Sequence, residues 1–239
     1  DPAMTAQWVP ALSRLAANMM DLTVDFVADE ANQKSFETRG LANLLWAWAT
    51  AGRASHEAYG IVSQCMIRQT EQHLDDGSDP RGVLQPQDWS NSLWAFAKAR
   101  VYVGHEELLA CLAILLHRYP WFVDSFKSQD VANTVWSVAT LLSNKRVDLS
   151  EAVSERPQTA ALSVLRPLLL SVVHSKAENF KPQELANILW SMATLGFGLS
   201  SSQDQSNNTY LILERDRQPE DSQIMLETVD VLVQISITM

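Results

Sequence analysis

The stretch "LANILWSMATLG", residues 185–196, decides the fold, because the chain contains four versions of it. The other three are "LANLLWAWATAG" at 41–52, "WSNSLWAFAKAR" at 89–100 and "VANTVWSVATLL" at 131–142. In every version an Asn precedes a Trp by three residues, and the pairs are Asn43 with Trp46, Asn91 with Trp94, Asn133 with Trp136, and Asn187 with Trp190. Successive asparagines are 48, 42 and 54 residues apart, a spacing typical of repeats that consist of two helices.

Each version has the periodicity of an amphipathic helix. At about 100° per residue, the residue before the Asn and those two, five and six residues after it form one apolar stripe. From the first copy to the fourth, these positions hold Ala42, Ser90, Ala132 and Ala186; Leu45, Leu93, Val135 and Leu189; Trp48, Phe96, Val138 and Met192; and Ala49, Ala97, Ala139 and Ala193. The tryptophan of each pair lies at the edge of this stripe.

Start signals precede each of these helices. Pro86 and Pro182 suit the first helical turn, where a missing N–H costs nothing, and Thr38 and Ser128 stand at the same place as potential caps. Three residues before the Asn, three copies carry an acid that should favour the helix N-terminus through the helix dipole. These acids are Asp88, Asp130 and Glu184.

A second apolar helix is expected after each of the first three copies, at 55–74, 105–119 and 159–177, and residues 5–31 have the pattern of such a helix from a preceding unit. The predicted fold is all-α, an α-solenoid of about four two-helix repeats followed by a C-terminal tail that the pattern does not assign. The expected divisions are 1–35, the end of a preceding repeat; 36–199, the repeats, at 36–83, 84–125, 126–179 and 180–199; and 200–239, a linker and divergent tail.

Composition sets limits on the function. A chain of 239 residues that is 46% hydrophobic buries a sizeable core, and its two cysteines do not make a disulfide framework. The formal net charge of −10 is unlike the basic excess of a typical nucleic-acid-binding domain. No apolar run reaches the roughly 20 residues that cross a bilayer, so no membrane contact is expected. The start "DPAMTAQWVP" has no initiator Met and no visible targeting peptide, which predicts a fragment of a longer protein.

The segment "FKPQELANILWSMATLG" at 180–196 resembles the octotricopeptide-type helical repeats of algal and apicomplexan proteins, which are similar to the repeats of RAP-domain and FAST-kinase-like proteins. The resemblance covers about residues 36–197, through four copies. It implies an α-solenoid that binds single-stranded RNA in a mitochondrion or chloroplast and acts in RNA stability, processing or translation. The RAP domain that often follows such repeats is not recognisable in this sequence.

The repeated Asn and Trp are interpreted first as architecture. A bulky Trp at the edge of an apolar stripe favours packing between units over base stacking. Four identical asparagines cannot discriminate between bases, so a ladder of amide hydrogen bonds between units is preferred to direct RNA contact.

Positions that differ between copies are the better candidates for RNA contact, with a solvated helix face as the alternative of equal weight. Polar groups there suit base edges, and the lysines near the helix starts suit phosphates. The candidate RNA-binding residues are Arg39, Gln87, Lys98, Lys127, Gln129, Thr140, Lys181, Gln183 and Thr194.

No catalytic motif is present: the five histidines are dispersed, no Cys/His spacing suits zinc, and no phosphate-binding glycine loop occurs. The sequence therefore predicts a non-enzymatic protein without cofactor or metal. Two functions stay open, an RNA-binding solenoid and a protein-interaction scaffold of HEAT or armadillo type. The second is suggested by the net acidity.

Overall fold

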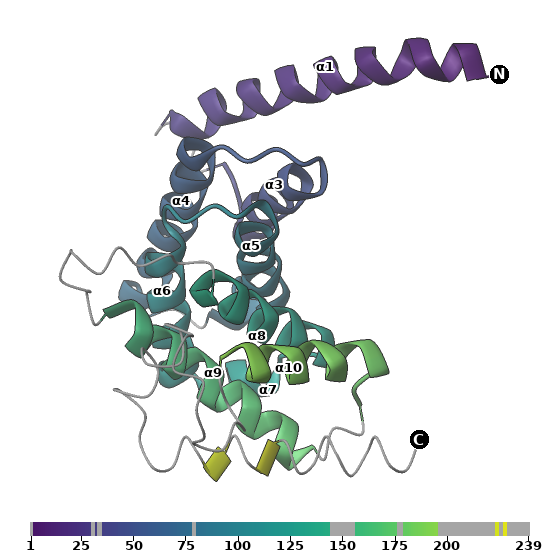
Figure 1. Ribbon diagram of the computed structural model, residues 1–239. Helices are drawn as coiled ribbons and strands as arrows, with labels where there is room; N and C mark the ends of the chain where they lie inside the picture. The colour runs from purple at the N-terminus through teal and green to yellow at the C-terminus, as the bar shows by residue number, and fades with distance from the viewer. Residues whose placement is uncertain are drawn as a thin grey trace, which may run out of the picture.

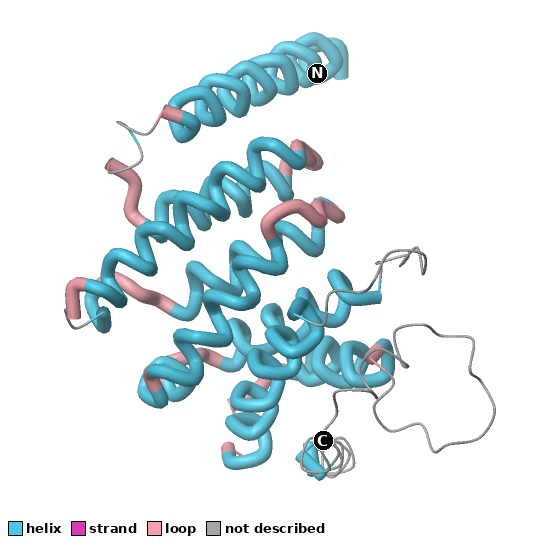
Figure 2. Tube along the Cα trace, turned by 90° about the vertical axis from the view of Figure 1, so that its left-hand side faces the viewer, coloured by secondary structure: helices cyan, strands magenta, loops and turns pink. Residues whose placement is uncertain are grey.

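The computed structural model describes residues 2–29, 32, 35–77, 80–143, 156–175, 179–195, 223–224 and 227–228. All regular secondary structure in these residues is helical, and Figures 1 and 2 show no strand among them. The helices are α1 (Pro2–Ala28), α3 (Thr38–Thr50), α4 (His56–Asp75), the 3-10 helix η1 (Pro80–Gly82), α5 (Pro86–Ala99), α6 (His105–Arg118), α7 (Pro120–Asp124), α8 (Ser128–Ser143), α9 (Arg156–His174) and α10 (Pro182–Thr194). The all-α prediction is confirmed.

The four copies of the opening stretch form α3, α5, α8 and α10, which we call the first helices. Each begins five residues before its Asn, at Thr38, Pro86, Ser128 or Pro182, as the start signals predict. The predicted capping by Thr38 is wrong, because the N-cap of α3 is Glu37 and the Thr38 hydroxyl is buried without a hydrogen-bond partner.

The predicted second helices are present as α4, α6 and α9, and the predicted helix at 5–31 is α1. The first helices form one layer, in which α5 packs between α3 and α8, and α10 packs on α8. The second helices form another layer, in which α6 packs between α4 and α9, and α1 packs on α4. Figure 1 shows α1 extending well beyond the remaining helices.

The first helices run parallel and in register. Arg39 contacts Asp88, and Ser90 contacts Asp130, so the N-terminal turn of one helix lies beside the N-terminal turn of the next. Farther along, the rings of Trp136 and Trp190, which hold the same place in their copies, lie 6.5 Å apart. Equivalent residues of successive copies therefore lie in rows across the layer.

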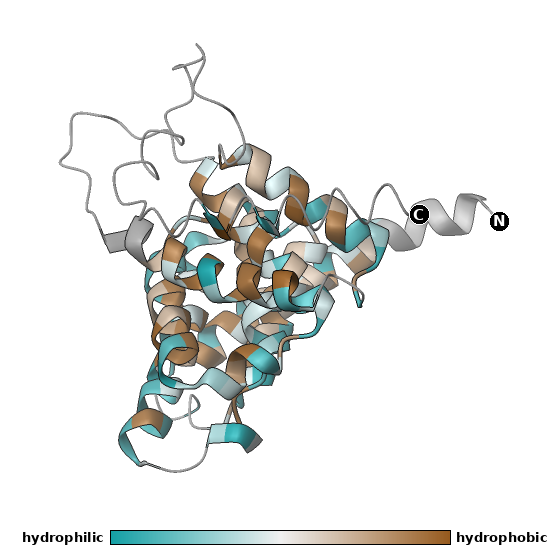
Figure 3. Cartoon of the chain, turned by 90° about the horizontal axis from the view of Figure 1, so that it is seen from below, coloured by the Kyte–Doolittle hydropathy of each residue, from teal (hydrophilic) through white to brown (hydrophobic). Residues whose placement is uncertain are grey.

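The predicted apolar stripe is buried through the first three copies. Leu45, Leu93 and Val135 have no exposed surface, and the small residues before their asparagines are equally buried. In the fourth copy Ala186 and Ala193 are exposed and Leu189 is half-buried, because α10 packs on one first helix rather than between two. Figure 3 shows how hydrophobic and hydrophilic residues alternate around the helices.

An aromatic cluster joins the first two copies. The ring of Tyr59 on α4 lies 6.0 Å from Trp48 on α3 and 5.1 Å from Phe96 on α5. The Tyr59 hydroxyl donates to the carbonyls of Leu45 and Arg53, at 3.5 and 3.4 Å, which satisfies its polar end in the core. Burial raises the pKa of Tyr59 well above its usual range.

Two features were not anticipated from the sequence. The short helix α7 places Phe122 in the core, with its ring 5.5 Å from that of Phe126. On α1, a row of large apolar side chains is exposed, and its members are Leu12, Leu15, Met19, Leu22 and Phe26. The predicted linker and tail at 200–239 lie outside the described residues, apart from 223–224 and 227–228.

Gly104, which precedes α6, provides a test of this packing. Its φ of 84° is a left-handed conformation that residues with a Cβ rarely adopt, and a Cβ there would collide with the hydroxyl oxygen of Ser63 on α4. Gly104→Ala should therefore lower the free energy of unfolding by about 2 kcal/mol in urea titrations. Gly82→Ala is the matched control, because a Cβ at Gly82 meets open space, and it should change the free energy of unfolding little. Equal effects of the two substitutions would contradict this packing.

Candidate functional site

The four first helices separate their charges by sign. All three of their acids are buried, with Asp88, Asp130 and Glu184 only 4, 6 and 7% exposed. Their two bases, Arg39 and Lys98, are both exposed. The outer surface of these helices therefore carries no acid from within the helices themselves.

Asp130 occupies the boundary between α5 and α8. One carboxylate oxygen accepts a hydrogen bond from the backbone N–H of Lys127 at 3.2 Å, and the other accepts from the Ser90 hydroxyl of α5, also at 3.2 Å. Burial raises the pKa of Asp130, the two hydrogen bonds oppose this, and the charge of Glu184 adds to it. The carboxylate thus caps its own helix and joins it to the preceding one.

Asp88 holds the equivalent place on α5, but its carboxylate has fewer and longer polar contacts than that of Asp130. Arg39 Nε of α3 lies 3.9 Å from one carboxylate oxygen, and the other oxygen is buried without a hydrogen bond. Ala42 stands where the next copy has Ser90, so the first copy lacks the corresponding hydroxyl. Burial raises the pKa of Asp88 to about 6, Arg39 lowers it, and Asp130 raises it further.

Sequence reasoning assigned these acids only to the helix dipole and missed their position between helices. Glu184 does cap α10, because its carboxylate accepts from the Lys181 N–H at 2.8 Å. The available signal was the small residue two positions after each acid, which allows a neighbouring helix to approach closely.

One side of the first-helix layer faces solvent, and we call the row of exposed and half-buried residues along it the strip. The candidate RNA-binding residues lie along this strip. Arg39, Gln87, Lys98, Lys127, Gln129, Lys181 and Gln183 are exposed, and Thr140 and Thr194 are half-buried. Because the helices are in register, the glutamines form a row near the helix starts, with Lys127 and Lys181 beside them. Lys98, Thr140 and Thr194 form a row at the opposite end of the strip.

The asparagines lie in the middle of this strip rather than in a ladder between units. Asn43 is exposed, and Asn91, Asn133 and Asn187 are half-buried. The hydrogen bonds found among the described residues include one with an amide of this set, from Gln183 Nε2 to Asn187 Oδ1 at 3.1 Å, within α10 itself. Polar contact between first helices is made instead by the acids.

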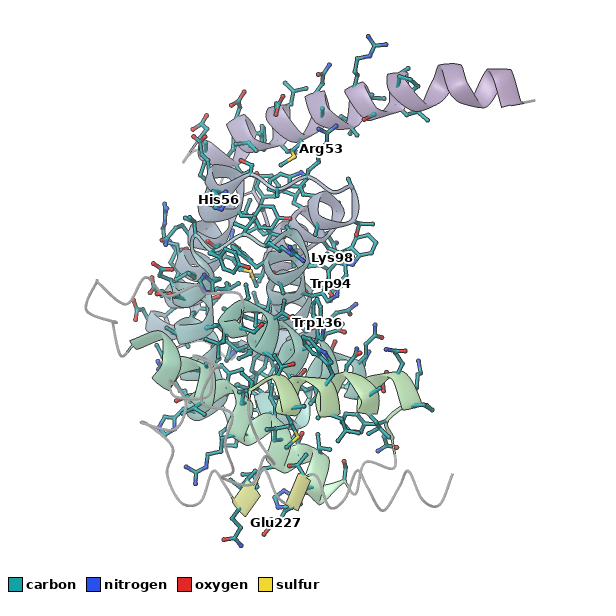
Figure 4. The ribbon with its side chains drawn as sticks, viewed as in Figure 1. Arg53, His56, Trp94, Lys98, Trp136 and Glu227 are labelled. Carbon is teal, nitrogen blue, oxygen red and sulfur yellow. The ribbon has the colours of Figure 1, made fainter. Side chains whose placement is uncertain are left out.

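The tryptophans beside them are only partly packed. Trp94 and Trp136 are half-buried against the core, as the packing interpretation expects. Trp46 and Trp190 expose 47 and 48% of their surface, far more than a packing residue needs. Figure 4 shows Lys98, Trp94 and Trp136 one below another on the side formed by α5 and α8.

The second helices α4 and α6 have the opposite charge pattern, whereas α9 contains no acid and two arginines, Arg156 and Arg166. On α4, Glu57, Glu71 and Asp75 are exposed, and on α6 Glu107 is exposed. Exposed bases on these two helices are fewer, namely Arg68 and Arg118. Several of the exposed acids in the described residues thus lie on α4 and α6, although Glu37, the N-cap of α3, is an exposed acid next to the first helices.

Among the described residues, no three His, Cys, Asp or Glu side chains come together in an arrangement that would hold a metal ion. No described helix combines the length and the apolar character needed to span a membrane.

The chain is similar to a family of proteins of unknown function (DUF1601), whose model matches residues 123–135 and 164–189. The matched residues include Asn133 and Asn187 with the helix starts before them, so the similarity lies in the third and fourth copies. No curated protein and no solved structure matches the chain.

Asp88 makes the stability of the protein depend on pH. A buried acid whose pKa is raised binds its proton more tightly in the folded state, so the free energy of unfolding falls as the pH rises from about 4 to about 6. Asp88→Asn removes this ionisation and should raise the free energy of unfolding at pH 7.5 by about 1–3 kcal/mol, with a shallower dependence below pH 6. Urea titrations across this range measure both effects.

Asp124→Asn is the matched control, because Asp124 is an exposed acid at the end of α7. It should change the free energy of unfolding little. If Asp88→Asn leaves the pH dependence as it is in the unchanged protein, Asp88 is not a destabilising buried acid.

Proposed function

We propose that this chain is an α-solenoid of about four two-helix repeats that binds single-stranded RNA along the exposed strip of its first helices. The observation that carries the proposal is the separation of charge within those helices, whose acidic side chains are buried and whose basic side chains are exposed. A polyanion can approach this strip without meeting an acid of the helices that line it.

The net charge of −10 would be expected to repel RNA, but this separation keeps the acids within the first helices away from the proposed RNA site. Nucleic-acid affinity depends on the charges beside the phosphates rather than on the sum over the chain. Arg39, Lys127 and Lys181 lie at the N-terminal end of the strip and Lys98 at the other end, so these four basic side chains outnumber the one exposed acid among the described residues at the helix starts, Glu37.

The uncharged groups of the strip suit unpaired bases. Glutamine and asparagine amides both donate and accept hydrogen bonds, as base edges require. The hydroxyl oxygen of Thr140 is buried, so Thr140 does not offer such a group. The repeated, in-register arrangement supports the solenoid interpretation, since the N-terminal turns of successive first helices contact one another and the equivalent residues Trp136 and Trp190 lie side by side. From the resemblance to octotricopeptide-type repeats, the proposed role is in organellar RNA stability, processing or translation, in a mitochondrion or chloroplast, with no catalytic part for this region.

Removing the lysines of the strip tests this function. The triple variant Lys98→Ala, Lys127→Ala and Lys181→Ala should weaken binding of a single-stranded RNA by tenfold or more, because each lysine contacts a phosphate. The slope of log affinity against log salt concentration should fall by about 2, since each phosphate contact in single strands contributes about 0.7. Fluorescence anisotropy with a labelled oligonucleotide at several salt concentrations gives both numbers.

The matched control removes three bases that lie elsewhere, Arg14 on α1, Arg68 on α4 and Arg118 on α6. This variant has the same net charge as the lysine variant and should bind RNA nearly as well as the unchanged protein. Equal losses in both variants, or no RNA binding by the unchanged protein, would contradict an RNA site on the first helices.

The exposed row on α1 favours a second candidate function, protein–protein interaction. Leu12, Leu15, Met19, Leu22 and Phe26 follow one another at spacings of three and four residues, which is the pattern of a helix that packs along another helix. Met20 and Val27, on another side of α1, are already buried against the rest of the protein. The partner for this row would be an apolar helix of another protein.

Leu15→Glu combined with Leu22→Glu tests this second candidate. Leu15 and Leu22 are 54 and 67% exposed, so the substitutions should change the free energy of unfolding by less than about 0.5 kcal/mol. In cells, a photoreactive residue at Met19 should crosslink to a helical segment of one protein, and the double variant should lose that crosslink. A reproducible absence of crosslinks at Met19 in the unchanged background would count against the second candidate.

A further inference from the structure

The tryptophans of the four Asn–Trp pairs are the most exposed aromatic feature of the first-helix strip. Trp46 and Trp190 expose about half of their surface, 47 and 48%, and Trp94 and Trp136 are half-buried. Leaving this much of an indole in water is unfavourable for folding, because apolar surface gains free energy when it is removed from water. A packing role accounts for Trp94 and Trp136 but not for the exposed halves of the other two.

The layer places these rings in a row. The first helices are parallel and in register, and neighbouring packed helices lie about 8–10 Å apart. The rings of Trp136 on α8 and Trp190 on α10 lie 6.5 Å apart and are tilted by 34°, so the aromatic surface continues from one helix to the next. Figure 4 shows Trp94 above Trp136 on the same side of the molecule.

Each tryptophan has an amide for a neighbour. Residues three apart lie on the same face of a helix, so the Asn of each pair lies one turn before its Trp on the exposed strip. In the fourth copy, Gln183 donates to Asn187 Oδ1 at 3.1 Å and orients that amide beside Trp190. A flat apolar surface next to an oriented amide suits an unpaired base, which offers a π-face for stacking and an edge for hydrogen bonds.

We propose that Trp46, Trp94, Trp136 and Trp190 form a stacking row for unpaired RNA bases, one base per repeat, with the preceding asparagine at the edge of each base. This inference rests on the proposed RNA-binding function and assigns the residues that hold the bases. Single-stranded RNA is the occupant because no acid within the first helices is exposed on the strip, and basic side chains lie at both of its ends. Those side chains can contact the phosphates of an RNA whose unpaired bases lie on the tryptophans. Base-paired RNA keeps its base faces stacked inside the helix and would not fit this row.

In this arrangement, affinity for RNA and preference among its bases come from different residues. Four identical Trp–Asn pairs stack any base, so they contribute affinity without much preference. Among the positions on the strip, the one four residues before each Asn differs between the first copy, which has Arg39, and the other three, which have glutamine, so any preference at this position would distinguish the first copy from the rest.

The two most exposed tryptophans provide the test, because changing them does not open the core. Trp46→Leu and Trp190→Leu keep an apolar side chain but remove the flat aromatic surface. Each should weaken binding of a labelled single-stranded RNA, long enough to span four repeats, by about fivefold or more. Trp46→Phe and Trp190→Phe retain a ring and should bind within about twofold of the unchanged protein.

Ile114→Leu is the control, because Ile114 is an exposed apolar residue on α6 in the other layer, 53% exposed. It should leave RNA affinity unchanged, and equal unfolding midpoints will show that all variants are folded. A duplex of the same sequence should compete poorly for the protein.

The outcomes separate this inference from the function on which it rests. If the leucine variants bind RNA as well as the unchanged protein while the lysine variant binds weakly, RNA binding stands and the stacking row is wrong. If the unchanged protein binds no single-stranded RNA, both proposals are wrong. Loss of affinity in the leucine variants and its retention in the phenylalanine variants would establish the row.

Discussion

Close packing of the inner first helices, α5 and α8, on both of their flanks is the constraint on which the rest of the structure depends. α5 packs against α3 on one side and α8 on the other, and it also contacts the second helix α6. A helix enclosed in this way has one narrow strip left for solvent. Every polar residue outside that strip must find a partner among its neighbours or remain buried without one.

The buried acids show the consequence most clearly. Asp130 satisfies the constraint, because the Lys127 N–H and the Ser90 hydroxyl both donate to it. Asp88 meets this requirement only in part, because one of its carboxylate oxygens is buried without a hydrogen bond and its pKa is raised to about 6. Burial of these acids also changes the surface, because a carboxylate that is buried between helices adds no negative charge to the outer face of the first helices.

Much of the fold could be predicted from the sequence because the signals are local. Helix starts follow from Pro86 and Pro182, and the buried faces follow from the apolar periodicity of the four copies. The candidate site was predicted less completely. The variable polar residues do lie on the exposed strip, but the asparagines were expected between units and lie at the surface instead. An amide and a carboxylate close together on the same helix are both polar, and periodicity alone does not say which of them faces a neighbouring helix.

By itself, the sequence determined the long helices, the starts of the first helices and the order in which equivalent units follow one another, because these depend on residues close together in the chain. Only the tertiary structure decided which side of each helix stays in solvent. That choice depends on the two neighbouring helices, which come from copies more than forty residues away. The packing of these neighbours buries Asp88, Asp130 and Glu184 and leaves Trp46 and Trp190 half exposed, so that the acids within the first helices are removed from the surface of an acidic chain.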